Sequence, residues 1–361
     1  MYFLSQKNRA MINLNIYGWN DKLAQLKQKS IYNTLVHGRV VIVHRTCYEV
    51  VSENGLFQCE LTGNMMYGKA DFELPCTGDW VVFQPFDESK GIIVDMLSRE
   101  RTLYRKRNGT VSDKQAIASY VDKAFIVQSP DDNFNVRRAE RFMVQILEAN
   151  INSVLVLNKA DLDFDRQKIE DQIKHITRQI PVFFTSICLP QTILQLRESI
   201  SEGETVVFVG SSGVGKSSLV NALCKKATLL TSAISLSTGK GRHTSTRREM
   251  VLMDGSGVLI DTPGVREFGL ALDKSDSLTE VLEISDYEKS CRFRDCKHIN
   301  EPGCAVLKAI DSGILDYKVY ENYLKLRREA WHFSALEHEK RRKDKSFTKL
   351  VEEVKKRKAG F

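Results

Sequence analysis

One segment of the chain has the residue types and the spacing needed to hold a phosphate chain. The run Gly210-Ser211-Ser212-Gly213-Val214-Gly215-Lys216-Ser217 fits G-x-x-x-x-G-K-[ST], the pattern of the P-loop. Its glycines allow backbone N–H groups to turn toward phosphate oxygens, Lys216 would reach the β- and γ-phosphates, and the Ser217 hydroxyl would bind Mg²⁺. Apolar residues before the run predict a strand, and Ser218 opens a predicted helix whose N-terminal dipole favours phosphate. This context favours a nucleotide site over a chance glycine-rich turn.

A second motif has the chemistry to select the base of that nucleotide. Asn158-Lys159-Ala160-Asp161 follows a predicted strand and fits N-K-x-D. The Asp161 carboxylate can accept hydrogen bonds from guanine N1–H and the 2-amino group, Asn158 can meet the O6/N7 edge, and the Lys159 stem can lie over the base. Another predicted strand ends at Thr185-Ser186, where a backbone N–H could contact guanine O6. Guanine is therefore the predicted base.

A third group of residues suits Mg²⁺ and the γ-phosphate. Gly239 to Thr246 is a polar, glycine-bracketed segment typical of a switch loop, in which either Thr244 or Thr246 could supply a second hydroxyl to Mg²⁺. Asp261-Thr262-Pro263-Gly264 fits D-x-x-G, where Asp261 would act on Mg²⁺ through water and the Gly264 N–H would contact the γ-phosphate. The next residue, Val265, cannot orient a water molecule. His243 is the candidate for that catalytic role, with an exposed loop histidine as the alternative.

A cluster of thiols near the C-terminal end suits a metal ion. Cys291, Cys296, His298 and Cys304 follow C-x₄-C-x-H-x₅-C. Three thiolates and one imidazole complete a tetrahedral zinc site with no open position, which predicts one structural Zn²⁺. Buried or redox-active cysteines are the alternative. The other five of the eight cysteines are scattered among apolar residues, a pattern typical of the reducing cytosol.

The elements that must position these residues indicate a multidomain α/β protein. After an N-terminal extension (1–30), five short strand-like runs predict an OB-like β-barrel (31–100). Such a barrel binds oligonucleotides or only scaffolds other contacts. Alternating strand and helix patterns then predict a P-loop GTPase domain (101–285), in which N-K-x-D precedes the P-loop instead of following it, so the domain is circularly permuted. The remainder (286–361) is predicted to be a helical zinc-binding domain with a basic tail.

The distribution of charge suggests an acidic partner. The chain carries a formal charge of +7, and the segment from Lys340 to Lys358 alone has ten cations against three acids. Such a run is usually solvated, but beside a zinc module it makes RNA phosphate a plausible target. Neither a membrane-length apolar run nor a secretory leader is evident, so we expect a cytoplasmic protein without membrane contact. A monomer is the expected oligomeric state.

In these motifs the chain resembles the RsgA family of GTPases, which depend on the small ribosomal subunit. The permuted order of N-K-x-D, P-loop and D-x-x-G, the preceding barrel, the following zinc cluster and the run Gly241-Arg242-His243-Thr244 carry the resemblance from about Val36 onward. The resemblance implies a GTP hydrolase that binds GTP/GDP and ribosomal RNA and acts late in assembly of the small subunit, which would stimulate hydrolysis. The rival classes are a metabolic GTPase and an RNA-binding scaffold with a degenerate nucleotide site.

Overall fold

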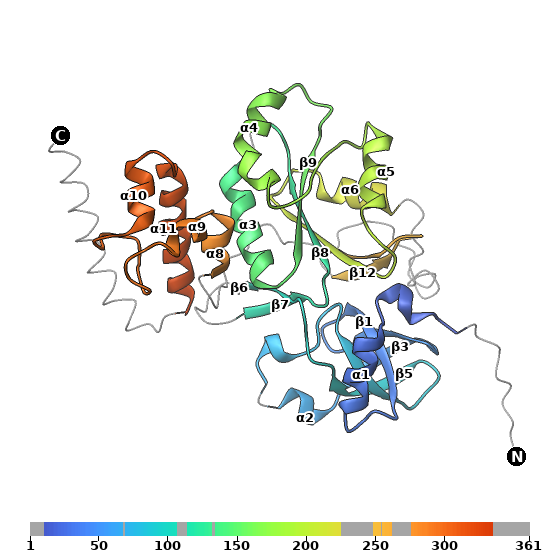
Figure 1. The fold of residues 1–361 in the computed structure, drawn as a ribbon. Coiled ribbons are helices and arrows are strands. Elements are labelled where there is room, and N and C mark those ends of the chain that lie inside the picture. Colours follow the sequence, from blue (N-terminus) through green and yellow to red (C-terminus); the bar gives the residue numbers. More distant parts are fainter. Residues whose placement is uncertain are drawn as a thin grey trace, which may run out of the picture. The chain divides into compact units, whose positions relative to one another are not determined.

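The structure is a computed structural model that describes residues 11–67, 69–106, 114–131, 134–224, 248–253, 255–261 and 276–334 (Figure 1). The chain divides into two compact units, one of residues 1–105 with 114–268 and the other of residues 106–113 with 269–361. In the described residues, the first unit holds a barrel and an α/β sheet, and the second holds helices. The domain boundaries expected at residues 30, 100 and 285 stay predictions.

The barrel closes through five strands, as the sequence predicts. They are β1 (Val36–Val43), β2 (Tyr48–Ser52), β3 (Gly55–Leu61), β4 (Trp80–Pro85) and β5 (Lys90–Met96). Antiparallel pairing joins β1 to β2 and β2 to β3, β5 lies between β3 and β4, and β4 returns to β1. Inward-facing residues, among them Val40, Phe57, Phe83 and Ile93, fill its core. The loop between β3 and β4 carries α2 (Gly63–Met66) and η2 (Asp71–Glu73).

A short N-terminal segment packs on the barrel. It consists of η1 (Leu14–Tyr17) and α1 (Asp21–Lys29). Asn20 caps α1 by accepting a hydrogen bond from the N–H of Leu23 at 3.1 Å. Between the two helices, the Trp19 ring lies against His37 of β1 and Trp80 of β4, with centroids 4.0 and 4.8 Å apart.

After the barrel, β6 (Leu103–Lys106) and β7 (Lys114–Ala118) form a two-stranded sheet. The α/β sheet begins with the next strand. Its strands run in the order β10-β9-β8-β11-β13-β12, and all are parallel except β12. Figure 1 shows α3 and α4 on one side of the sheet and α5 and α6 on the other. The bounds are β8 (Lys123–Gln128), α3 (Val136–Glu148), β9 (Asn152–Asn158), α4 (Arg166–Thr177), β10 (Val182–Thr185), α5 (Pro190–Glu198), β11 (Thr205–Gly210), α6 (Lys216–Leu223), β12 (Glu249–Leu252) and β13 (Val258–Asp261).

The sheet and the barrel are hydrogen-bonded to each other. Strand β12 pairs with β13 on one side and with β1 of the barrel on the other, where Glu249 lies opposite Ile42. The two sheets therefore form one series of eleven strands.

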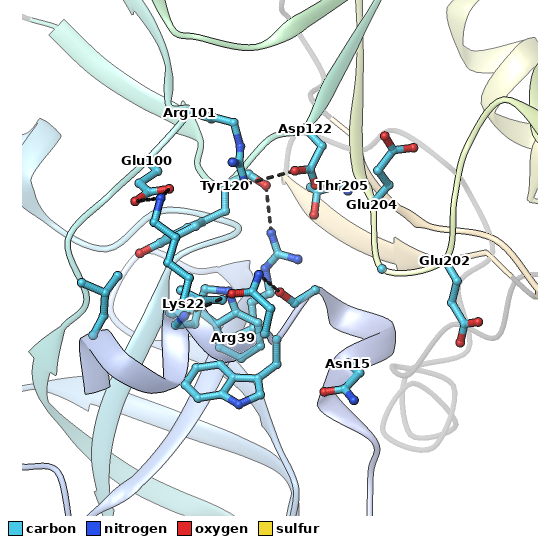
Figure 2. A pocket seen from close by; sticks show the side chains of 17 residues that line it. Asn15, Lys22, Arg39, Glu100, Arg101, Tyr120, Asp122, Glu202, Glu204 and Thr205 are labelled. Carbon is cyan, nitrogen blue, oxygen red and sulfur yellow. Dashed lines mark hydrogen bonds and ion pairs between the residues drawn. The ribbon is translucent and has the colours of Figure 1, made fainter. Parts of the chain in front are cut away.

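A buried arginine reinforces this joint within the first unit (Figure 2). Arg39 is 1% exposed, and its guanidinium donates to the carbonyl oxygens of Gly78 at 3.0 Å, Tyr120 at 3.4 Å and Tyr17. Its guanidinium carbon lies 5.5 Å from the centroid of the Trp80 ring. One side chain thus joins the N-terminal segment, the barrel and the start of the α/β region.

Four helices form the described part of the second unit. They are α8 (Asp276–Val281), α9 (Ser285–Glu288), α10 (Ala305–Asp311) and α11 (Tyr317–Ser334), with Leu278, Ile284, Val306 and Leu326 buried among them. No helix in the described residues combines the length and apolar character needed to cross a bilayer.

Replacing Arg39 by methionine should destabilise the contact between the barrel, the N-terminal segment and the start of the α/β region. The Arg39→Met side chain fills the space but cannot donate to the three carbonyls, so we expect the free energy of unfolding to fall by about 2 kcal/mol. Urea unfolding followed by tryptophan fluorescence measures it, since Trp19 and Trp80 lie at the site. Arg45→Met, at an exposed barrel position, is the matched control; equal losses in both variants would contradict the role of Arg39.

Candidate nucleotide site and metal centre

The motifs singled out in the sequence meet at one edge of the α/β sheet. Asn158 ends β9, Thr185 ends β10, Gly210 ends β11 and Asp261 ends β13. Since these strands are parallel, their carboxyl ends lie on the same side, and Thr185 is directly opposite Asn158. In open α/β sheets this edge is where ligands bind.

The P-loop has a backbone that only its glycines permit. Gly210 and Gly215 have φ angles of 146° and 89°. A Cβ at Gly210 would lie 2.2 Å from the carbonyl oxygen of Val127, and one at Gly215 would lie 2.2 Å from Nδ2 of Asn158. Buried Val214 and Leu219 anchor the loop and the first turn of α6 in the core. The buried residues therefore hold one side of the loop against the core, while Ser212, Gly213, Ser217 and Ser218 are exposed to solvent.

Lys216 begins α6 and folds back over the loop. Its ammonium donates to the carbonyl oxygens of Gly210 at 2.7 Å and Ser211 at 2.5 Å. A ligand phosphate at this loop would have to exchange these bonds for bonds to its own oxygens.

The base-selecting motif is tied to the P-loop by Asn158. Its Nδ2 donates to the carbonyl oxygen of Val214 at 2.8 Å, and its Oδ1 accepts from the Thr185 hydroxyl at 3.3 Å. The N–H of Ala160 donates to the Thr185 carbonyl at 3.0 Å, and Lys159 has a φ of 64°. Asn158 therefore connects three segments of the site.

Asp161 is oriented by the loop that follows β10. The Ser186 hydroxyl donates to its Oδ1, which holds the pKa of the Asp161 carboxyl below its usual range. The N–H of Ser186 itself donates to Oγ1 of Thr192 at 3.0 Å. In the described structure the neighbouring N–H of Ile187 has no acceptor, and the residue is 54% exposed. The sequence offered a backbone N–H at Thr185-Ser186 for guanine O6; the hydrogen bond to Thr192 shows that the N–H of Ser186 is already engaged.

Of the remaining residues expected at the Mg²⁺ and γ-phosphate positions, the structure describes Asp261. Asp261 lies at the end of β13, and burial raises the pKa of its carboxyl. His243, Thr244, Thr246 and Gly264 lie outside the described residues.

The four candidate metal ligands come together between α9 and α10. The ligand atoms of Cys291, Cys296, His298 and Cys304 all lie within 4.8 Å of one another. Nδ1 of His298 is 3.6 Å from Sγ of Cys291 and 3.4 Å from Sγ of Cys304, and these two sulfurs are 3.9 Å apart. A tetrahedral ion with metal–sulfur bonds of about 2.3 Å requires sulfurs about 3.8 Å apart. The cluster has the dimensions to hold a metal ion.

Neighbouring groups hold these ligands in place. His298 adopts a φ of 56°, and its carbonyl oxygen accepts from the Tyr320 hydroxyl at 2.6 Å. Its Nε2 lies 3.6 Å from a carboxylate oxygen of Glu288, an arrangement that leaves Nδ1 to the ligand cluster. The Glu301 carboxylate accepts from the N–H groups of Lys297, Ile299 and Asn300. Burial alone would raise the pKa of Glu301, but these N–H groups and its own N–H lower it to about 2.

Known proteins of similar sequence share one family description. The family model described as "RsgA GTPase" matches residues 96–271. The protein "Small ribosomal subunit biogenesis GTPase RsgA 1" of Bacteroides thetaiotaomicron is 75% identical over 349 residues, covering 97% of this chain and 98% of the relative. A relative of Leptospira interrogans, "Small ribosomal subunit biogenesis GTPase RsgA", is 34% identical over 360 residues, covering 97% and 98%.

Two solved structures share the fold. The crystal structure of YjeQ from Thermotoga maritima has a TM-score of 0.62 at 25% identity and covers 82% of this chain and 98% of its own. YloQ, "a circularly permuted GTPase", has a TM-score of 0.60 at 25% identity, with coverages of 83% and 96%. The predicted circular permutation is confirmed.

Two glycines of the P-loop should respond differently to alanine. Both Gly213 and Gly215 have positive φ, but only at Gly215 would the new Cβ meet another group, the Asn158 amide. Gly215→Ala should therefore lower the free energy of unfolding by about 1–2 kcal/mol more than Gly213→Ala, which serves as its control for backbone strain. Thermal unfolding of the two variants measures the difference, and equal midpoints would contradict the contact between Asn158 and the loop.

Proposed function

This chain belongs to the RsgA GTPase family, whose members hydrolyse GTP, and we propose that it acts in biogenesis of the small ribosomal subunit. The observation that supports this most strongly is the 75% identity with a relative of that name over almost the whole length of both chains. The convergence of the P-loop, N-K-x-D and Asp261 at one sheet edge agrees with it. The proposed site of action is therefore the cytoplasm, and the proposed state is a monomer.

The proposed guanine site consists of Asp161, Asn158, Lys159 and Ile187. Ionised Asp161, oriented by Ser186, accepts the N1–H and 2-amino hydrogen bonds of guanine. The stem of Lys159 lies along the base. Asn158, whose Nδ2 and Oδ1 are already bonded to Val214 and Thr185, holds the P-loop against the base site instead of meeting the O6/N7 edge expected from the sequence. The N–H of Ile187, rather than that of Ser186, meets O6, because the Ser186 N–H already donates to Thr192.

The proposed phosphate site is the P-loop with the start of α6. The N–H groups of residues 210–218 and the Lys216 ammonium bind the phosphates, and Ser217 with Asp261 would hold Mg²⁺. Bound Mg²⁺ supplies charge neutralisation for the phosphates. Thr244 or Thr246 would add a hydroxyl, and the Gly264 N–H would contact the γ-phosphate. His243 orients the attacking water once the ribosomal subunit is bound.

Zn²⁺ is the proposed occupant of the Cys₃His cluster. Three thiolates with one imidazole and no further donor suit a structural zinc rather than a catalytic one. This ion would crosslink the segment from Cys291 to the start of α10, which the apolar contacts of such a short loop alone would not fix.

Ribosomal RNA is the proposed partner of the barrel and of the segment from Cys291 to Cys304, which carries the candidate metal ligands. Arg292, Arg294 and Lys297 are exposed between the metal ligands, so the ion that orders the loop also presents three cations to phosphate. On the barrel, exposed Tyr67 and Phe86 offer rings on which unpaired bases can stack.

GTP turnover with ribosomal particles tests this function. We expect slow turnover by the protein alone, an increase of about two orders of magnitude or more with small subunits but not large ones, and no turnover of ATP. His243→Ala should bind GTP as before and lose most of the stimulated rate. A turnover rate that small subunits do not change would contradict the proposed role at the ribosome. An unchanged stimulated rate in His243→Ala would contradict the proposed catalytic role of the histidine.

Metal analysis tests the zinc proposal. The purified protein should contain about one zinc per chain, and Cys304→Ser should lose most of it together with thermal stability, since Cys304 is a buried member of the cluster. Cys188→Ser, at an exposed free cysteine, is the control and should keep its zinc. Equal zinc contents in the two variants, or none in the original protein, would contradict the assignment.

A further inference from the structure

The loop after β8 leaves the sheet inside the nucleotide site. Strand β8 lies between β9 and β11, with Gln128 opposite Leu157 and Val127 opposite Gly210. The residues that follow Gln128 therefore emerge between the base-selecting motif and the P-loop. This loop has no signature in the P-loop, N-K-x-D or D-x-x-G patterns.

An acidic side chain on this loop contacts the lysine of N-K-x-D. Oδ2 of Asp131 lies 3.4 Å from Nζ of Lys159, and the same oxygen accepts a hydrogen bond from the Ser129 hydroxyl at 2.7 Å. Ser129 is fully buried, so water does not compete for this hydrogen bond. The ion pair is only partly exposed, with 36% of the Lys159 side chain and 32% of the Asp131 side chain accessible.

Hydrogen bonds also connect the residues at the two ends of this loop. The Gln128 side chain donates to the carbonyl oxygen of Asn135 at 2.9 Å and accepts from its N–H at 3.0 Å. Asn135 also caps α3 by accepting from the N–H of Arg138 at 3.1 Å. Asp131 is thus presented by a loop whose two ends are fixed to β8 and α3.

We propose that Asp131, held by Ser129, is a positioning residue for guanine binding that acts through Lys159. A free lysine side chain loses rotamer freedom when it is laid along a base, and this loss weakens binding. A carboxylate that holds the ammonium beforehand removes part of that cost. The proposal rests on the nucleotide site described under the proposed function and adds a residue to its base end.

Affinities of unlabelled nucleotides test the proposal. Isothermal titration calorimetry avoids a label on the ribose. Asp131→Asn keeps the shape but not the charge, and it should weaken GDP and GTP alike by about fivefold, the size expected for a partly exposed ion pair. The single-turnover rate constant at saturating GTP should change much less than the affinity. Asp171→Asn, at an exposed position of α4, is the matched control and should change neither.

A double-mutant cycle with Lys159 decides the mechanism. If Asp131 acts through Lys159, Asp131→Asn should cause no further loss in a Lys159→Ala background. An equal fivefold loss in that background, or unchanged affinity in the single variant, would overturn the proposal. A loss for GDP that vanishes for 2′-deoxy-GDP would assign Asp131 to the ribose instead and also overturn it. If the original protein bound no GDP, the proposed function would fail first.

Discussion

The geometry of a parallel sheet is the constraint on which the rest of this structure depends. Parallel neighbours present their carboxyl ends at one edge, so the site needs β9, β10, β11 and β13 to be close in the sheet, in whatever order the chain visits them. Circular permutation changes the connections and leaves these neighbours unchanged. The hydrogen bond from Asn158 to the Val214 carbonyl illustrates this, because it joins two motifs that are 56 residues apart and in reversed order along the chain.

A single antiparallel strand connects that edge to the barrel. Strand β12 directly follows the segment with the expected switch residues, pairs with β13, which ends at Asp261, and pairs with β1 on its other side. Just before β12, Arg248 donates to the carbonyl oxygen of Ala116 in β7 at 3.0 Å. A shift of β12 would therefore break hydrogen bonds on two sides. Within the first unit, the start of β12 is thus held by pairing with β13 and β1 and by the bond from Arg248 to β7.

The sequence predicted those features whose residues are close together along the chain. The P-loop, N-K-x-D and D-x-x-G have fixed spacings, four ligands within fourteen residues must lie near one another, and the barrel strands alternate with clear turn residues such as Asn54-Gly55. Contacts between distant segments were not predictable. Strand β6 lies in a basic stretch without period-2 alternation, and Arg39 resembles any strand arginine until Tyr17, Gly78 and Tyr120 surround it. The roles proposed for Ile187 and Asp131 likewise depend on the contacts of Ser186 with Thr192 and of Asp131 with Lys159, which the motif patterns do not contain.

The two ends of the nucleotide site differ in how far they are assembled. At the base end, Ser186 already orients Asp161, and Asn158 is bonded to both the P-loop and β10. At the phosphate end, Lys216 donates to the carbonyls of Gly210 and Ser211, so binding requires an exchange of hydrogen bonds. That exchange is favourable because a phosphate oxygen is charged and a carbonyl oxygen is not. The proposed base end is therefore already hydrogen-bonded within the fold, and among the described residues of the P-loop Lys216 is the side chain whose hydrogen bonds a bound phosphate would exchange.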